Sequence, residues 1–244
     1  MKKRIFFLCL ILVCTLGMAA KKTKQGTRSN DDSRVFTGVI SYYGKVTRIP
    51  DRSLSKAKLG DTDSNFKLYM NRNFTKRIES FEGITITITE GINQDIYYQT
   101  ISTPEDNTLI VATLQEQRDF QLTAKTVRYA SVRVREMSGK KKINGYECRK
   151  AVCDMVTEDN VRIQLIAWYA PELQIPHYRV PFFGELKGLP LLYDCYNGEH
   201  VVTYNSTSVK RQDVSDRFFD LPTDVEPISM TEYIRRVQTG NSEE

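Results

Sequence analysis

Apolar and polar residues alternate at every second position in several short stretches of the chain. The clearest stretch is ITITITE, in which Ile84, Ile86 and Ile88 alternate with three threonines. This period places the isoleucines on one face of a β-strand and the threonine hydroxyls on the other. The stretch therefore predicts a half-buried strand with one apolar face.

Strand-like stretches recur along the rest of the chain, separated by turn signals. They are residues 35–46, 66–70, 95–102, 126–137, 146–156, 161–170, 190–196 and 200–209. Asn197–Gly198, between the last two stretches, is a strong hairpin-turn pair. We interpret the lysine-rich residues 139–145 as another turn.

Helical signals are few. The stretch from Asn107 fits a strand at first and could begin a helix at residues 115–120. The tail at residues 232–238 predicts a helix, with Ser229 as its N-cap and Glu232 three residues later.

The expected architecture is a single sheet. Strands that follow one another through hairpin turns favour an antiparallel sheet over βαβ units. An antiparallel sheet with one apolar face must close, curl or be covered. We therefore expect a mainly β protein, with few short helices and one domain over residues 35–244.

The first 20 residues, MKKRIFFLCLILVCTLGMAA, predict a signal peptide. Three positive charges precede an apolar run that ends in small residues, which is the pattern of secretory signals. The uncharged stretch is shorter than the roughly 20 residues that a membrane span needs, so we expect cleavage near Ala19 or Ala20 and export of the protein. Two alternatives are an uncleaved N-terminal anchor and a lipoprotein with Cys14 as the lipidated residue. Residues 21–34 are polar and charged, which is typical of a flexible tether.

The net charge of +5 over 244 residues belongs to the N-terminal segments. Residues 1–34 hold eight basic and two acidic side chains, whereas residues 35–244 hold 27 basic and 28 acidic ones. A nucleic-acid-binding domain needs a basic surface that neutralises phosphates. The nearly neutral domain therefore argues against nucleic acid as a partner.

Catalytic and metal-binding motifs are scarce. The sequence has no Walker-type phosphate loop, no GxGxxG after a strand, no GxSxG and no HExxH. Its two histidines, His177 and His200, stand at no spacing typical of a zinc site. Cys195 and His200 flank a turn and are the one pair suited to thiol catalysis, but no third group that orients the histidine is visible. We therefore expect no enzyme, no metal and no cofactor.

Three cysteines follow the predicted signal peptide: Cys148, Cys153 and Cys195. Export makes an oxidised pair feasible. Cys148 and Cys153 are five residues apart, so on one strand they point to opposite faces and cannot bridge each other. A disulfide would therefore join Cys195 to one of them, with Cys148–Cys195 as the candidate pair. The alternative is three unpaired thiols that pack as small apolar side chains.

An aromatic-rich and proline-rich stretch covers residues 168–196. Its prolines are interleaved with aromatic side chains, which excludes a regular helix or strand throughout. We interpret the stretch as a flap over the sheet that presents Trp168, Phe182 and Phe183. Such a flap can form the mouth of a hydrophobic pocket, or it can simply fill the core.

Three runs in this part of the chain resemble a known family. They are KINGYECRKAVC (142–153), IAWYAPEL (166–173) and FGELKGLPLLYD (183–194). In this order the runs resemble the GLPGLI family of exported Bacteroidetes proteins and the related LolA-like domain of unknown function. Leu191 and Tyr193 stand where the family has its second glycine and its final isoleucine.

The resemblance implies a curved antiparallel sheet, a half-barrel with an apolar concave face, in the periplasm or at the outer membrane. It supplies no catalytic residues. In the family's turn, Gly188 permits the bend, and Pro190 lies where a strand can begin without an amide donor.

Two functions fit these expectations. The first is a cell-envelope protein that binds a lipid, an acyl chain or another apolar group on the concave sheet. The second is an interaction protein that docks on an outer-membrane protein and holds no small ligand. The binding residues expected for the first function are Ile84, Ile86, Ile88, Trp168, Phe182, Phe183, Leu189 and Tyr193.

Overall fold

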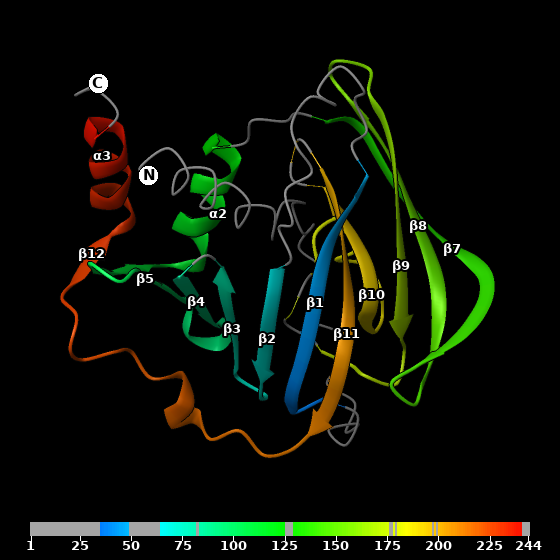
Figure 1. Ribbon diagram of the computed structural model, residues 1–244, viewed down its shortest axis with the longest axis horizontal. Helices are drawn as coiled ribbons and strands as arrows, with labels where there is room; N and C mark the ends of the chain where they lie inside the picture. The colour runs from blue at the N-terminus through cyan, green and yellow to red at the C-terminus, as the bar shows by residue number, and fades with distance from the viewer. Residues whose placement is uncertain are drawn as a thin grey trace.

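The described part of the chain is built around one curved sheet of 12 strands (Figure 1). The computed structural model describes residues 35–48, 64–81, 83–124, 129–175, 178, 180–196, 198 and 200–240. The strands are β1 (Gly38–Arg48), β2 (Ser64–Met70), β3 (Phe74–Phe81), β4 (Ile84–Gly91), β5 (Ile96–Ser102), β6 (Asn107–Ala112), β7 (Tyr129–Ile143), β8 (Tyr146–Thr157), β9 (Arg162–Ala170), β10 (Leu189–Tyr196), β11 (Val201–Arg211) and β12 (Pro227–Ser229). The described helical elements are α2 (Leu114–Ala124), α3 (Met230–Gly240) and the 3-10 turns η4 (Ile92–Gln94) and η5 (Asp216–Phe219).

The strands follow the order β12-β6-β5-β4-β3-β2-β1-β11-β10-β9-β8-β7 across the sheet. Neighbouring strands pair antiparallel, except that β12 runs parallel to β6. The predicted mainly β fold with a curved antiparallel sheet is therefore confirmed.

The lysine-rich segment predicted as a turn is a strand. Strand β7 continues through it to Ile143, and the turn consists of Asn144 and Gly145 alone, with φ of 48° and 89°. Two successive residues with positive φ form the tight hairpin turn that fits the twist of the flanking strands. The lysines suggested a loop, but β7 lies at the edge of the sheet, where lysines commonly protect an unpaired strand.

The strand registers divide the side chains between two faces. Ile88 on β4 pairs with Arg77 on β3, and Arg77 pairs with Leu68 on β2. Because paired residues lie on the same face, this row and its period-2 neighbours define one face, which we call the inner face. The threonines of ITITITE lie on the opposite face, which we call the outer face.

Two separate apolar clusters cover the inner face. The large cluster packs β1, β2 and β8 to β11 against Leu173, Val180, Phe183 and Leu186. These four residues belong to the segment between β9 and β10, and we call its described part the flap. The helical cluster packs Tyr97 and Ile110 of β5 and β6 against Leu114 of α2 and Met230 of α3. In the sheet order, β3 lies between the two clusters.

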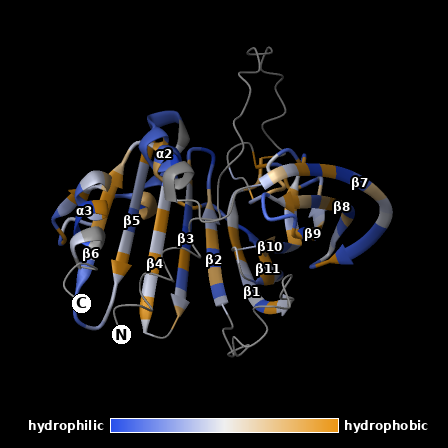
Figure 2. Cartoon of the chain, turned by 90° about the horizontal axis from the view of Figure 1, so that it is seen from above, coloured by the Kyte–Doolittle hydropathy of each residue, from blue (hydrophilic) through white to orange (hydrophobic). Residues whose placement is uncertain are grey.

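The β7–β8 end of the sheet rolls back over the inner face. In the turn between these strands, the Asn144 side chain donates hydrogen bonds of 2.8 Å to the carbonyl oxygen and to the hydroxyl of Ser206 on β11. Two strands separate β8 from β11 in the sheet order, so the turn reaches Ser206 across the inner face. Figure 2 shows the strong curvature of β7 and β8 that this contact requires.

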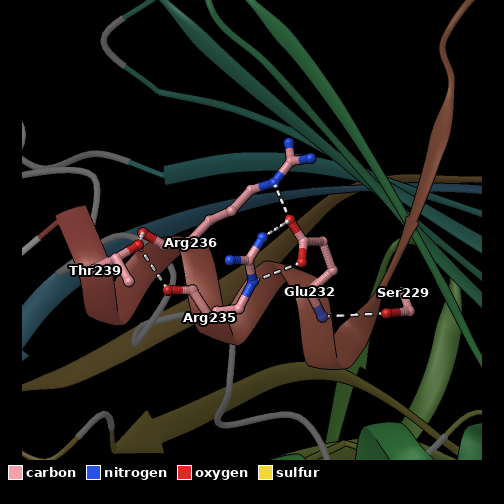
Figure 3. Close-up of polar contacts among 5 residues, drawn as sticks. All are labelled: Ser229, Glu232, Arg235, Arg236 and Thr239. Carbon is pink, nitrogen blue, oxygen red and sulfur yellow. Dashed lines mark hydrogen bonds and ion pairs between the residues drawn. The ribbon is translucent and has the colours of Figure 1, made fainter.

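Helix α3 begins beside its predicted capping residue, and α2 begins next to the residues predicted to start a helix. The Ser229 hydroxyl accepts a hydrogen bond of 3.1 Å from the backbone N–H of Glu232 (Figure 3), which confirms the predicted N-cap of α3. The Glu232 carboxylate then pairs with Arg235 and Arg236 one turn later, at 2.9 and 2.8 Å. Strand β6 ends at Ala112 and α2 follows directly, so the ambiguous stretch from Asn107 holds both elements.

The segment between β11 and β12 packs on the outer face. Phe219 of η5 is buried and stacks on Phe74 of β3 at a ring distance of 5.3 Å, and Phe218 lies 4.6 Å from the ring of Tyr69 on β2. This packing carries the chain across the sheet to β12, which extends the edge at β6. Within the described ranges, neither α2 nor α3 has the length and apolar character of a membrane-spanning helix.

Candidate functional site

The three candidate isoleucines of β4 lie on the inner face. Ile86 is buried, whereas Ile84 and Ile88 are only half-buried and pack at the border of the helical cluster. The part of the inner face formed by these isoleucines is therefore apolar but incompletely covered by the described residues.

The flap fills the other end of the inner face. Val180 and Phe183 are 3% and 2% exposed, and both belong to the large cluster. The candidate residues Leu189 and Tyr193, both on β10, are buried in the same cluster. Phe182 lies at its border, where its ring meets the edge of Tyr129 at 5.5 Å. The candidate residues thus fall into two groups, one at each apolar cluster.

Trp168 also packs at the border of the large cluster, but it lies on the outer face. Its strand neighbours Ala167 and Tyr169 are buried in the large cluster, so strand alternation turns Trp168 to the other side. The ammonium groups of Lys141 and Lys150 lie 5.8 and 6.0 Å from the centre of its ring. Trp168 therefore packs beneath lysines on the outer face and does not line the same surface as the other candidates.

Cys148, Cys153 and Cys195 are buried and form no disulfide with one another. Cys148 and Cys195 lie on β8 and β10, with β9 between them. At a strand spacing of about 4.8 Å, their Cα atoms are farther apart than the roughly 7 Å that a disulfide allows, so the candidate pair is not formed. Burial raises the pKa of Cys148 to about 11 and that of Cys153 to about 12, which keeps both side chains protonated at neutral pH.

The centre of the inner face holds a group of polar side chains that the sequence patterns did not single out. We call it the polar cluster: Thr75, Arg77 and Glu79 on β3, and Glu90 on β4. The registers place Glu90 opposite Thr75 and Arg77 opposite Ile88. The polar cluster therefore lies between the isoleucines of β4 and the aromatic residues of the large cluster.

Arg77 and Glu79 form a buried ion pair. The Arg77 Nη2 atom lies 2.8 Å from Glu79 Oε2, and the two side chains are 12% and 9% exposed. The Ser64 hydroxyl of β2 donates a second hydrogen bond to the Glu79 carboxylate. The Arg77 Nε atom is also buried, and it has no hydrogen-bond partner in the part of the chain that the structure describes.

Aromatic rings enclose the Arg77 guanidinium. Its Cζ atom lies 4.0 Å from the ring centre of Phe66 and 5.8 Å from that of Tyr204. Tyr204 fits here because the nearby residue of β1 is Gly44, where a Cβ atom would come within 2.5 Å of the ring. Tyr193 extends this group of aromatic residues, with its ring centre 5.3 Å from that of Tyr204. Contacts of this kind stabilise a cation and restrict its movement.

Burial dominates the electrostatics of Glu90. It raises the pKa of the carboxyl group from 4.5 to about 7, although the hydrogen bond from Thr75 and the charge of Arg118 on α2 act in the opposite direction. At neutral pH a large fraction of Glu90 is therefore uncharged, which suits its apolar surroundings.

One sequence signal could have revealed the polar cluster. In FTKRIESF, Arg77 and Glu79 are opposite charges two residues apart, so they share one face of a strand. Polar residues stand on both faces of this strand, however, and the periodicity does not show which face points inward.

The described residues contain no group of His, Cys, Asp or Glu side chains suited to hold a metal ion. Arg77 is a cation that the inner face offers to a ligand beside the half-buried isoleucines Ile84 and Ile88. This arrangement of one fixed cation beside an apolar surface can hold an amphiphile.

A scan against protein-family models and a search of curated proteins each find no match. Among solved structures, the chain is similar to a crystal structure described as an outer membrane lipoprotein-sorting protein domain from Vibrio parahaemolyticus. The identity is 8% and the TM-score is 0.30, over 77% of this chain and 92% of that chain. A likeness at this level establishes no common family, so the resemblance to the GLPGLI and LolA-like proteins stays a prediction.

Proposed function

We propose that the protein is an exported, non-enzymatic binding protein of the cell envelope that holds an acyl chain or another apolar group on the inner face of its sheet. The observation that carries the proposal is the incomplete cover of β4, where Ile84 and Ile88 stay half-buried beside the polar cluster. Each methylene group buried there would contribute about 0.8 kcal/mol to binding, so a short groove suffices for useful affinity.

Export and location in the periplasm or at the outer membrane are part of this proposal. They are supported by the signal-peptide pattern of residues 1–20, which lie outside the described residues. An exported protein of the envelope meets lipids and acylated proteins as its most abundant apolar partners, which is consistent with an acyl ligand.

The alternative function is an interaction protein that docks on outer-membrane machinery without a small ligand. It is favoured by the flap, because Leu173, Val180 and Phe183 are buried among the core residues. A flap that fills the core leaves the ligand only the β3–β4 part of the inner face.

The test is direct detection of a bound lipid. The protein purified from its own host is analysed by native mass spectrometry and by lipid extraction. Purified protein is then titrated with cis-parinaric acid, a fatty acid that fluoresces when it is bound in an apolar site. We expect a bound acyl lipid in the first measurement and saturable fluorescence in the second.

Two substitutions on the same strand locate the site. Ile88→Asn places an amide on the inner face of β4 and should abolish probe binding, whereas Thr87→Asn, the matched change on the outer face, should leave it intact. Absence of lipid in the purified protein together with no binding across a lipid panel would favour the alternative function.

A further inference from the structure

The Arg77 guanidinium is a charged group in a place where charge is unfavourable. It lies between two apolar clusters, and an ion in such surroundings is destabilising unless its hydrogen-bond donors are satisfied. Glu79 satisfies only one part of the group, through Nη2. The Nε–H donor is buried and has no acceptor among the described residues.

Several contacts restrain the orientation of the Arg77 guanidinium. The guanidinium lies against Phe66 at 4.0 Å, Glu79 holds its Nη2 end, and the Glu79 carboxylate is itself held by Ser64. An arginine restrained in this way loses little freedom when it binds an anion, and its planar donors match the oxygens of a carboxylate or a phosphate.

The strand register places an apolar surface beside Arg77, where the hydrocarbon chain of a bound anion could lie. Arg77 lies directly opposite Ile88 on β4, at the Cβ separation of about 5 Å that is typical of paired residues. Ile86 and Ile84 follow along the same face. An anionic group at Arg77 would therefore place its hydrocarbon chain along β4, where Ile88 and Ile84 are half-buried.

We propose that Arg77 binds the anionic headgroup of an acyl ligand whose chain runs along β4 and contacts the half-buried Ile88 and Ile84. This inference rests on the proposed function and narrows the ligand to amphiphiles that end in a carboxylate or a phosphate. Arg77 thus decides which acyl compounds are held, and the isoleucines supply affinity without selecting a headgroup.

The test compares one chain with two headgroups. Full-length mature protein is titrated with cis-parinaric acid and with its methyl ester, which has the same chain and no charge. We expect the wild-type protein to bind the acid at least about 10-fold more tightly, the scale of a charge-assisted hydrogen bond in an apolar site. Competition with palmitate and with palmitoyl lysophosphatidate then shows whether the carboxylate or the phosphate is preferred.

The decisive variant removes both members of the ion pair. Arg77→Met with Glu79→Gln leaves no unpaired charge, and it should bind acid and ester equally, with the affinity for the ester unchanged. Arg135→Met with Asp154→Asn, at an exposed ion pair of β7 and β8, is the matched control and should keep the preference. Arg77→Lys keeps the charge without the Nε donor and should reduce the preference, which provides a second test if the double variant fails to fold.

Two results would overturn the inference alone: equal binding of acid and ester by the wild-type protein, or a preference for the acid that survives in the double variant. If neither compound binds the wild-type protein, the proposed function fails together with the inference. The outcome therefore distinguishes a wrong headgroup site from a wrong function.

Discussion

At the scale of single residues, the inner face combines apolar packing with the Arg77–Glu79 ion pair, which is not needed for stability. A buried ion pair is often no more stable than an apolar pair of similar volume, so Arg77 and Glu79 are not required to hold β3 in the sheet. Leu68 and Ile88 flank Arg77 on the neighbouring strands, and either would pack well against an apolar side chain. This contrast between an apolar environment and a retained charge distinguishes the polar cluster from the rest of the core.

Glu90 makes stability depend on pH. Its pKa of about 7 in the folded protein lies above the ordinary 4.5, so the folded state binds more protons than the unfolded state between these two pH values. The free energy of unfolding should therefore fall as the pH rises from 4.5 to 7, on the scale of about 1.4 kcal/mol per unit of pKa difference. Urea denaturation at pH 5 and at pH 8 measures this change.

Glu90→Gln should remove the Glu90 contribution, because an amide does not titrate in this range. The free energy of unfolding of the variant minus that of the wild type should therefore be larger at pH 8 than at pH 5. Glu105→Gln, which changes an exposed carboxylate in the loop after β5, is the control. The same pH dependence in wild type and Glu90→Gln would contradict the assignment.

At the scale of elements, the C-terminal segment covers the β6 edge of the sheet and part of the inner face. Strand β12 pairs with the edge at β6, and α3 places Met230, Tyr233 and Ile234 on the helical cluster. These residues recur at spacings of three and four, so they share one face of the helix. The opposite face holds Glu232 with its two arginines (Figure 3).

The N-cap of α3 should have a measurable effect. Ser229→Ala removes the acceptor for the Glu232 N–H, and loss of such a cap typically costs about 1 kcal/mol. We expect faster hydrogen exchange at the first amides of α3 and a lower urea midpoint. Thr231→Ala, an exposed position in the same turn, is the control and should change neither. An equal effect of the two substitutions would show that the cap does not stabilise the helix.

At the scale of the whole molecule, different elements cover the inner face at the two ends of the sheet. At one end, β7 and β8 roll over the inner face until Asn144 meets Ser206. At the other end, α2 and α3 lie on the inner face and β12 extends the edge. The polar cluster lies between these two covers, beside the half-buried Ile84 and Ile88 of β4.

The export expected for the molecule can be tested on the cellular protein. N-terminal sequencing should place the mature end near Ala20 or Lys21, because a charged start, a short apolar run and small residues form a cleavable signal. The protein should be recovered outside the cytoplasm. An intact Met1 would contradict this expectation, and a lipid attached to Cys14 would favour the lipoprotein alternative.

Local patterns determined the strands and the caps. The alternation of ITITITE, the hairpin signals and the Ser229–Glu232 spacing depend on contacts between residues close in sequence, so they predicted the mainly β fold and the start of α3. Local patterns do not predict where a strand lies in the order of the sheet. The lysine-rich segment was mistaken for a turn because its place at the sheet edge follows only from the strand order.

Tertiary structure decided the candidate site. Trp168 was expected beside Phe183, but strand alternation between two buried neighbours turns it to the outer face. Arg77 was not expected at all, because polar residues occupy both faces of β3 and only the pairing with Leu68 and Ile88 makes one face inner. Strand periodicity determines which residues share a face. Which face is buried, and which distant residues meet there, depends on the register and curvature of the whole sheet.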